Sequence, residues 1–115
     1  ALGLIDARAG RRADAVAQYA AAAAAAERAG AEALAVECWR VAGELALASG
    51  AETAAAEHWQ RAIDIAYRAG PAVERSSSAP VAATQLATIL RARGLTVQAE
   101  SLEERARRLL AGELR

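Results

Sequence analysis

Glycine recurs in this sequence at a fixed interval, and that interval limits the possible folds more than any other feature. The spacing is twenty residues, and it joins Gly10, Gly30, Gly50 and Gly70. The residues between them are mostly alanine, leucine, glutamate, arginine and glutamine, which are strong helix formers, and alanine alone supplies about a third of the chain. Because glycine readily adopts the left-handed backbone that follows a helix end, each interval predicts a helix that ends at the glycine.

The sequence predicts a series of helices interrupted by one long loop. The loop spans residues 71–78, where Pro71, a run of serines and a weak apolar pattern all disfavour helix. Pro80 then fits the first turn of the next helix, where a missing N–H is tolerated. No segment alternates apolar and polar residues over the length of a strand, so the predicted fold class is all-α. The predicted helices cover residues 1–9, 11–29, 31–48, 52–69, 79–92 and 95–111.

The chain also contains an internal repeat. A shift of forty residues aligns its first part with its second, and a shift of forty-four aligns the second with a weaker third copy. Each copy is a pair of antiparallel helices, and such pairs stack into an α-solenoid because one pair alone cannot bury its apolar face. A helical bundle closed around one core is the architectural alternative. The matched positions are Gly3/Gly43, Gly10/Gly50, Ala15/Ala55, Tyr19/Trp59, Ala22/Ala62 and Gly30/Gly70 in the first alignment, and Gly43/Ala87, Gly50/Gly94, Ala55/Ala99 and Ala62/Ala106 in the second.

The sizes of the side chains predict which positions lie at helix crossings and which fill the gaps between helix layers. Gly43, Ala55 and Ala62 are expected where paired helices cross, because small side chains let the backbones approach closely. Trp39 and Trp59 are expected to fill the wider gaps between layers.

The second copy carries the motif of a known family. Its Trp39-x2-Ala42-Gly43-x2-Ala46 is followed by Ala55-x3-Trp59, Ala62 and Pro71. This run resembles the tetratricopeptide repeat, whose signature is Trp-x2-Leu-Gly-x2-Tyr, then Ala-x3-Phe, then Pro. The family period is about 34 residues, so a period of forty indicates a variant with longer helices. The resemblance implies one domain over residues 1–115, a right-handed α-solenoid of about three helix pairs with the first pair truncated.

The resemblance also implies a binding surface. In tetratricopeptide arrays the first helix of each pair lines a concave groove that accepts an extended or helical segment of another protein. The groove would here carry both signs of charge, which suits a partner segment with polar and apolar faces. A subset of the family clamps the carboxy terminus of chaperone tails with lysine and asparagine, and this chain contains no lysine. The groove positions are Arg8, Glu37, Arg40, Glu44, Leu47, Thr84, Thr88 and Arg91.

The sequence offers few candidates for catalysis or ligand binding. Cys38 and His58 lie on adjacent predicted helices and could meet as nucleophile and base, but no third group orients them, so packing roles are favoured. One histidine beside Glu57 does not supply the three or four ligands that zinc needs. The glycines end helices and follow no strand, so no phosphate-binding loop is predicted. We therefore expect no enzyme activity, no metal and no cofactor.

Charge and hydropathy indicate which environments and partners the chain does not fit. Its 14 basic and 14 acidic residues cancel, and acid lies beside each short basic cluster, so nucleic-acid binding is not expected. No run of about 20 strongly apolar residues is present, so no membrane insertion is predicted. A single cysteine fits a reducing compartment such as the cytoplasm. The lack of methionine, even at position 1, predicts a piece of a longer array.

Three functions remain open from the sequence alone. The favoured one is a non-catalytic protein–protein interaction scaffold that binds a peptide or helical segment of a partner in the groove. A second is a structural module that forms a homo-oligomer, because a truncated first pair would expose an apolar face around Leu2, Leu4 and Ile5. A third is a regulatory segment of an enzyme whose catalytic part lies elsewhere.

Overall fold

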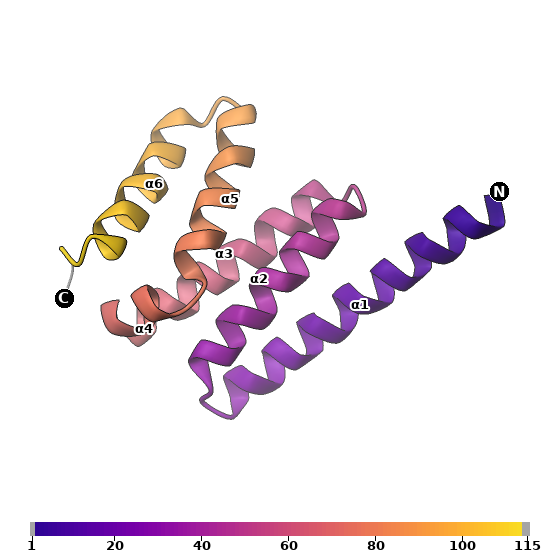
Figure 1. Ribbon diagram of the computed structural model, residues 1–115, viewed down its shortest axis with the longest axis horizontal. Coiled ribbons are helices and arrows are strands. Elements are labelled where there is room, and N and C mark those ends of the chain that lie inside the picture. The colour runs from indigo at the N-terminus through magenta and orange to yellow at the C-terminus, as the bar shows by residue number, and fades with distance from the viewer. Residues whose placement is uncertain (1, 114–115) are drawn as a thin grey trace.

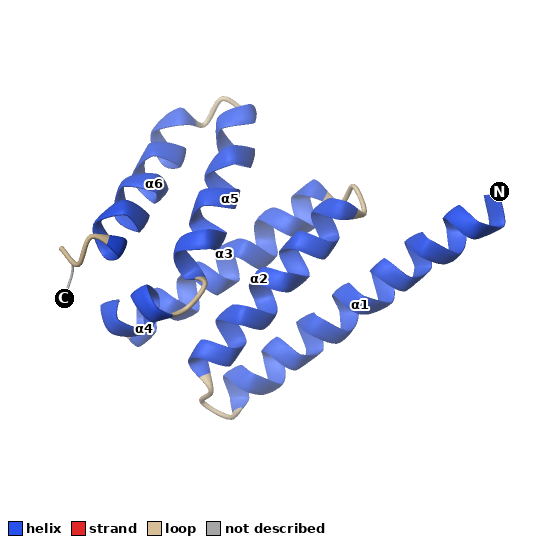
Figure 2. Cartoon of the chain, viewed as in Figure 1, coloured by secondary structure: helices blue, strands red, loops and turns tan. Residues whose placement is uncertain are grey.

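Helices make up nearly all of the chain that the structure describes. The computed structural model describes residues 2–113, with side chains from residue 10 onward. Within these residues there is no strand, and short turns join the helices (Figure 2). The prediction of an all-α fold is therefore confirmed. The helices are α1 (Leu2–Arg28), α2 (Glu32–Ala48), α3 (Glu52–Ala69), α4 (Pro71–Ser76), α5 (Ala79–Ala92) and α6 (Thr96–Leu110).

The helices pack one after another in the order of the sequence (Figure 1). Helix α1 packs against α2, α2 against α3, α3 against α5, and α5 against α6, while the short α4 lies against α3, α5 and α6. Helices α1 and α2, α2 and α3, and α5 and α6 run antiparallel, as the short turns between them favour. Helix α2 also contacts α5, so these two helices lie beside each other although α3 and α4 separate them in the chain.

Glycines end α1 and α2 as the sequence predicts. Gly30 and Gly50 have φ angles of +76° and +83° and lie in the turns that follow the two helices. Glycine adopts this left-handed backbone without the steric cost that a Cβ brings. After α1, the N–H of Ala31 donates to the carbonyl of Ala26 at 2.8 Å, which satisfies a carbonyl that the helix end would leave free.

The prediction of a helix end at Gly10 is wrong. Helix α1 runs without a break from Leu2 to Arg28, so the predicted helices over 1–9 and 11–29 are one. A Cβ added at Gly10 would meet no atom within 4 Å, so no close approach requires glycine there. One glycine inside a helix costs only about 1 kcal/mol, which the strong helix formers on both sides offset.

The predicted loop over residues 71–78 is also wrong for most of its length. Residues Pro71–Ser76 form α4, with Pro71 in the first turn where its missing N–H is not needed. A distant contact holds this helix, because Glu74, only 3% exposed, accepts two hydrogen bonds of 2.7 Å from Arg105 of α6. The guanidinium of Arg105 also lies over the ring of Tyr67 in α3, 4.7 Å from its centroid. A local sequence pattern cannot reveal a helix that depends on such partners.

A glycine and a tryptophan set the distance between α2 and α3. A Cβ on Gly43 would lie only 2.6 Å from Cδ1 of Trp59, well inside van der Waals contact. The Trp59 side chain is 1% exposed, and its Nε1 donates to the carbonyl of Arg40 at 3.1 Å. The predicted small residues Ala55 and Ala62 are fully buried in α3. Gly43 therefore makes the room that the indole of Trp59 occupies.

Candidate functional site

Most of the predicted groove residues lie on two neighbouring helices, α2 and α5. These helices contact each other, so their side chains can share one surface. The remaining residue, Arg8, belongs to α1, and its side chain lies outside the described residues. The residues on the two helices are Glu37, Arg40, Glu44 and Leu47 of α2, and Thr84, Thr88 and Arg91 of α5.

Arg40 is the centre of a row of charged side chains on α2. Its Nη1 donates to Glu44 at 2.7 Å, and its Nη2 pairs with Glu37. The two carboxylates stand three residues before and four residues after Arg40, which is the spacing that places helix side chains on one face. The Arg40 side chain is 18% exposed, whereas Glu37 is 48% and Glu44 37% exposed. The cation is thus largely covered and the two carboxylates remain partly open to solvent.

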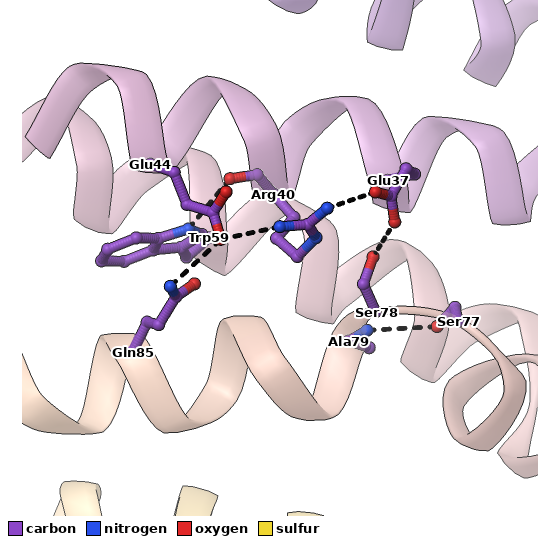
Figure 3. A network of polar contacts seen from close by, with 8 residues as sticks. All are labelled: Glu37, Arg40, Glu44, Trp59, Ser77, Ser78, Ala79 and Gln85. Carbon is purple, nitrogen blue, oxygen red and sulfur yellow. Dashed lines mark hydrogen bonds and ion pairs between the residues drawn. The ribbon is translucent and has the colours of Figure 1, made fainter. Parts of the chain in front are cut away.

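Two polar side chains connect this row to α5 (Figure 3). The hydroxyl of Ser78, at the start of α5, donates to Glu37, and the amide Nε2 of Gln85 donates to Glu44 at 3.1 Å. Helices α2 and α5, from the second and third predicted copies of the repeat, are therefore linked by hydrogen bonds to the same carboxylates that pair with Arg40. We name this network the α2–α5 seam, and it consists of Glu37, Arg40, Glu44, Ser78 and Gln85.

Hydrogen bonds within the seam favour the ionised forms of Glu37 and Arg40. Hydrogen bonds from Arg40 and then Ser78 lower the pKa of the Glu37 carboxyl, and the hydrogen bond to Glu37 raises the pKa of the Arg40 guanidinium. Both groups therefore stay ionised at neutral pH. One guanidinium between the carboxylates of Glu37 and Glu44 leaves the seam with one excess negative charge.

The other groove residues surround the seam or lie away from it. The hydroxyls of Thr84 and Thr88 donate to carbonyls of their own helix at 3.0 and 3.1 Å. Leu47 is 44% exposed near the C-terminal end of α2. Arg91 donates instead to Glu103 of α6 at 2.9 Å. The structure thus joins Glu37, Arg40 and Glu44 into one network and directs Arg91 to a different helix.

Ser78 and Gln85 are functional candidates that the sequence did not reveal. Ser78 is the N-cap residue of α5, but its side chain makes no cap hydrogen bond and donates to Glu37 instead. Each of the two residues lies 41 positions after its carboxylate partner in α2. The repeat shift is forty-four residues, so the contacting residues lie three positions, or about one helical turn, away from repeat-equivalent positions. Side chains that touch across these two helices are therefore not repeat equivalents.

Cys38 and His58 are used in packing. The ring of His58 stacks on Trp39 with centroids 5.3 Å apart, and its Nδ1 is buried without a hydrogen-bond partner. Burial, and then the charge of Arg61, lowers the pKa of the His58 imidazole. Burial, and then the charge of Glu37, raises the pKa of the Cys38 thiol, and a protonated thiol is a poor nucleophile.

Other features of the described chain bear on metals, membranes and basic clusters. No group of three His, Cys, Asp or Glu among the described residues could hold a metal ion. None of the described helices combines the length and the apolarity that crossing a membrane requires. Within the basic clusters, Arg12 donates to the carbonyl of Ala48 at 3.1 Å and Arg107 donates to Glu104 at 2.7 Å. Both guanidinium groups therefore make hydrogen bonds to acceptors of the same chain.

Comparisons with models of protein families, with curated proteins and with solved structures gave no match to this chain. The geometry of the α2–α5 seam is therefore the basis on which a function is proposed.

Proposed function

We propose that this chain is a non-catalytic scaffold that binds a peptide or helical segment of a partner protein along α2 and α5. The observation that supports the proposal most directly is the α2–α5 seam, because its hydrogen bonds hold two helices side by side and make one surface of their exposed side chains. The tetratricopeptide-like solenoid proposed from the repeat gives the same surface, since stacked helix pairs form extended concave binding faces.

The seam has two properties that favour binding. Its side chains are already paired with one another, so a partner does not have to immobilise them and the entropic cost of association falls. The carboxylates of Glu37 and Glu44 stay partly exposed, and each oxygen has more than one lone pair, so they can accept further hydrogen bonds. Exposed Leu47 adds an apolar contact at one end. This combination suits a partner segment that carries both donors and apolar side chains.

Selection of peptides on the immobilised protein, followed by measured affinities, tests the proposal. A random peptide library is selected on the whole chain, and each selected peptide is titrated by fluorescence anisotropy. We expect Glu37→Gln combined with Glu44→Gln to weaken binding about tenfold, which corresponds to 1.4 kcal/mol. The control is Glu100→Gln, which removes an exposed carboxylate from α6 and should leave the affinity unchanged.

Two results would contradict this function. The first is a library selection that yields no peptide with saturable binding. The second is binding that the control variant weakens as much as the seam variants do.

A further inference from the structure

Helix α1 leaves uncovered a stripe that the other copies of the repeat bury. In α3 the three equivalent side chains are at most 1% exposed, and in α6 the two alanines are at most 5% exposed. In α1 the central tyrosine is 41% exposed and one of the flanking alanines is exposed. The equivalent sets are Ala15, Tyr19 and Ala22 in α1, Ala55, Trp59 and Ala62 in α3, and Ala99 and Ala106 in α6.

Helix α2 has an uncovered stripe of its own beside α1. Helix α5 meets α2 through Ser78 and Gln85. The positions forty-four residues earlier are Leu34 and Val41, and in α2 they have no such helix against them, because Leu34 is 57% exposed and Val41 is half-buried. Helix α2 packs against both α3 and α5. The equivalent position, against α1 and α2, has no helix of the described chain in it. We name this place the α1–α2 seat, lined by Ala15, Tyr19, Ala22, Leu34 and Val41.

The two junctions match in structure as well as in sequence. Near the start of the described side chains of α1, Arg12 donates to the carbonyl of Ala48 at the end of α2, at 3.1 Å. Forty residues after Arg12, Glu52 begins α3 and accepts a hydrogen bond of 3.2 Å from Arg93, at the end of α5. Helix α1 therefore meets α2 in the same register in which α3 meets α5. The position of α2 beside α3 and α5 is consequently a template for what fits the seat.

We propose that the α1–α2 seat binds an amphipathic helix of a partner protein, placed and directed as α2 is beside α3. In the template, Gly43 of α2 lies against Trp59 with no room for a Cβ. The residue at the place of Trp59 in the seat is Tyr19. Because tyrosine is smaller than tryptophan, the partner helix has glycine or, at most, alanine opposite Tyr19.

The other two contacts of the template give the polarity of the partner helix. Helix α2 places Glu37 and Glu44 against polar residues of α5, but the seat offers Leu34 and Val41 at these places. A carboxylate at these places would face leucine or valine and find no hydrogen-bond donor, whereas an apolar residue would cover the exposed Leu34, so the bound helix has apolar residues there. Because Glu37 stands six residues before Gly43 and Glu44 follows it directly, the expected pattern is apolar-x5-Gly/Ala-apolar.

Charge complementarity supports the same direction. A helix antiparallel to α1 ends near Arg11, which lies four residues before Ala15 and so on the same side of α1. The structure gives Arg11, which is exposed, no partner among the described residues, whereas neighbouring Arg12 already binds the end of α2. A guanidinium at this place attracts the carbonyls and acidic side chains in the last turn of a bound helix.

A designed helix tests the seat directly. The probe is a labelled synthetic peptide with the sequence of residues 31–49 that carries Glu37→Leu, Cys38→Ala and Glu44→Leu, so that it has the expected pattern. Titrated with the whole chain and followed by fluorescence anisotropy, it should bind saturably. Tyr19→Glu or Leu34→Glu in the protein should weaken binding at least about tenfold. The matched control is Val97→Glu, which changes an 81% exposed residue of α6 and should leave the affinity unchanged.

A second probe and a mass measurement complete the test. The same peptide with Gly43→Leu should bind at least about tenfold more weakly, because the larger side chain cannot approach Tyr19. Light scattering over a wide concentration range should give the mass of a monomer for the protein alone. Thermal melting followed by circular dichroism checks that Tyr19→Glu and Leu34→Glu leave the fold intact, which their exposure predicts.

Three outcomes would overturn the proposal. One is the absence of saturable binding by the first peptide. Another is a Val97→Glu variant that loses as much affinity as Tyr19→Glu. The third is a dimer that Tyr19→Glu dissociates, because a second copy of the chain would then occupy the seat. Glu37 and Glu44 are unchanged in the protein variants of this test, and peptide binding at the α2–α5 seam is tested on its own by the combined Glu37→Gln and Glu44→Gln variant.

Discussion

Replacing Gly43 by alanine should destabilise the protein, although alanine is the better helix former. Gly43 lies inside α2, where a Cβ would stand 2.6 Å from Cδ1 and 2.8 Å from Cε2 of Trp59. The indole cannot move away freely, because it is 1% exposed and its Nε1 is hydrogen-bonded to the carbonyl of Arg40. The added methyl group must therefore push α2 and α3 apart or displace the ring.

Three contributions set the size of the effect. Inserting a methyl group into a close-packed core costs about 1–3 kcal/mol. Loss of the hydrogen bond from Trp59 to Arg40 adds about 1 kcal/mol. The higher helix propensity of alanine returns about 1 kcal/mol. We therefore expect the free energy of unfolding to fall by about 1–3 kcal/mol, which lowers the melting temperature by roughly 4–12 °C for a domain of this size.

Urea unfolding followed by circular dichroism measures this change, and a second glycine supplies the control. Gly10 also lies inside a helix, but a Cβ there would meet nothing within 4 Å, so Gly10→Ala should stabilise α1 by up to about 1 kcal/mol. Removing the indole with Trp59→Leu should abolish the cost of Gly43→Ala when both changes are combined. A Gly43→Ala variant as stable as Gly10→Ala would refute the steric explanation.

Three further predictions concern pH, a buried ion pair and a turn. Burial lowers the pKa of His58, so below about pH 6.5 the unfolded chain binds a proton more readily than the folded chain does. The free energy of unfolding in urea should therefore be lower at pH 5.5 than at pH 7.5. His58→Phe should remove that difference, and a difference that persists would implicate another group. Arg105→Ala leaves the buried carboxylate of Glu74 unpaired and should lower the free energy of unfolding, measured by thermal melting, by about 2–3 kcal/mol. The loss is smaller than for a fully buried pair because Arg105 is 36% exposed. Arg107→Ala, at an exposed pair, should leave the melting temperature unchanged. Gly30→Ala places a Cβ at a φ of +76° and should cost about 1 kcal/mol, and an unchanged melting temperature would disprove strain at this turn.

Features that depend on the backbone of one residue were predictable from the sequence. The turns at Gly30 and Gly50 were predicted because a positive φ needs glycine wherever it occurs. Gly10 misled the prediction because glycine is also tolerated inside a helix, and no local signal separates the two cases. Helix α4 was missed because Arg105 of α6 holds it through Glu74, thirty-one residues away in the chain.

The candidate site was predictable only within one helix. The spacing of Glu37, Arg40 and Glu44 places them on one face, and in the structure Arg40 pairs with both carboxylates. Their partners Ser78 and Gln85 belong to the next predicted copy of the repeat, and the register of α5 against α2 depends on how both helices pack against α3. A repeat aligned by sequence shows which positions are equivalent, but not which positions touch.

In a core built mainly from alanine, the few large side chains determine how each helix is placed on the one before it. The Nε1 of Trp39 in α2 donates to Glu27 of α1 at 2.9 Å, and the Nε1 of Trp59 in α3 donates to a carbonyl of α2 at 3.1 Å. Each indole thus combines a large buried ring with one directional hydrogen bond to the preceding helix. Tyr19 stands at the same position of the repeat as Trp59, with a hydroxyl that can serve the same purpose. Tyr19→Phe keeps the ring and removes that donor, so it should lower the affinity of the α1–α2 seat for the helical probe peptide severalfold without changing the melting temperature of the protein. Equal affinities of the two proteins would show that Tyr19 contributes shape alone.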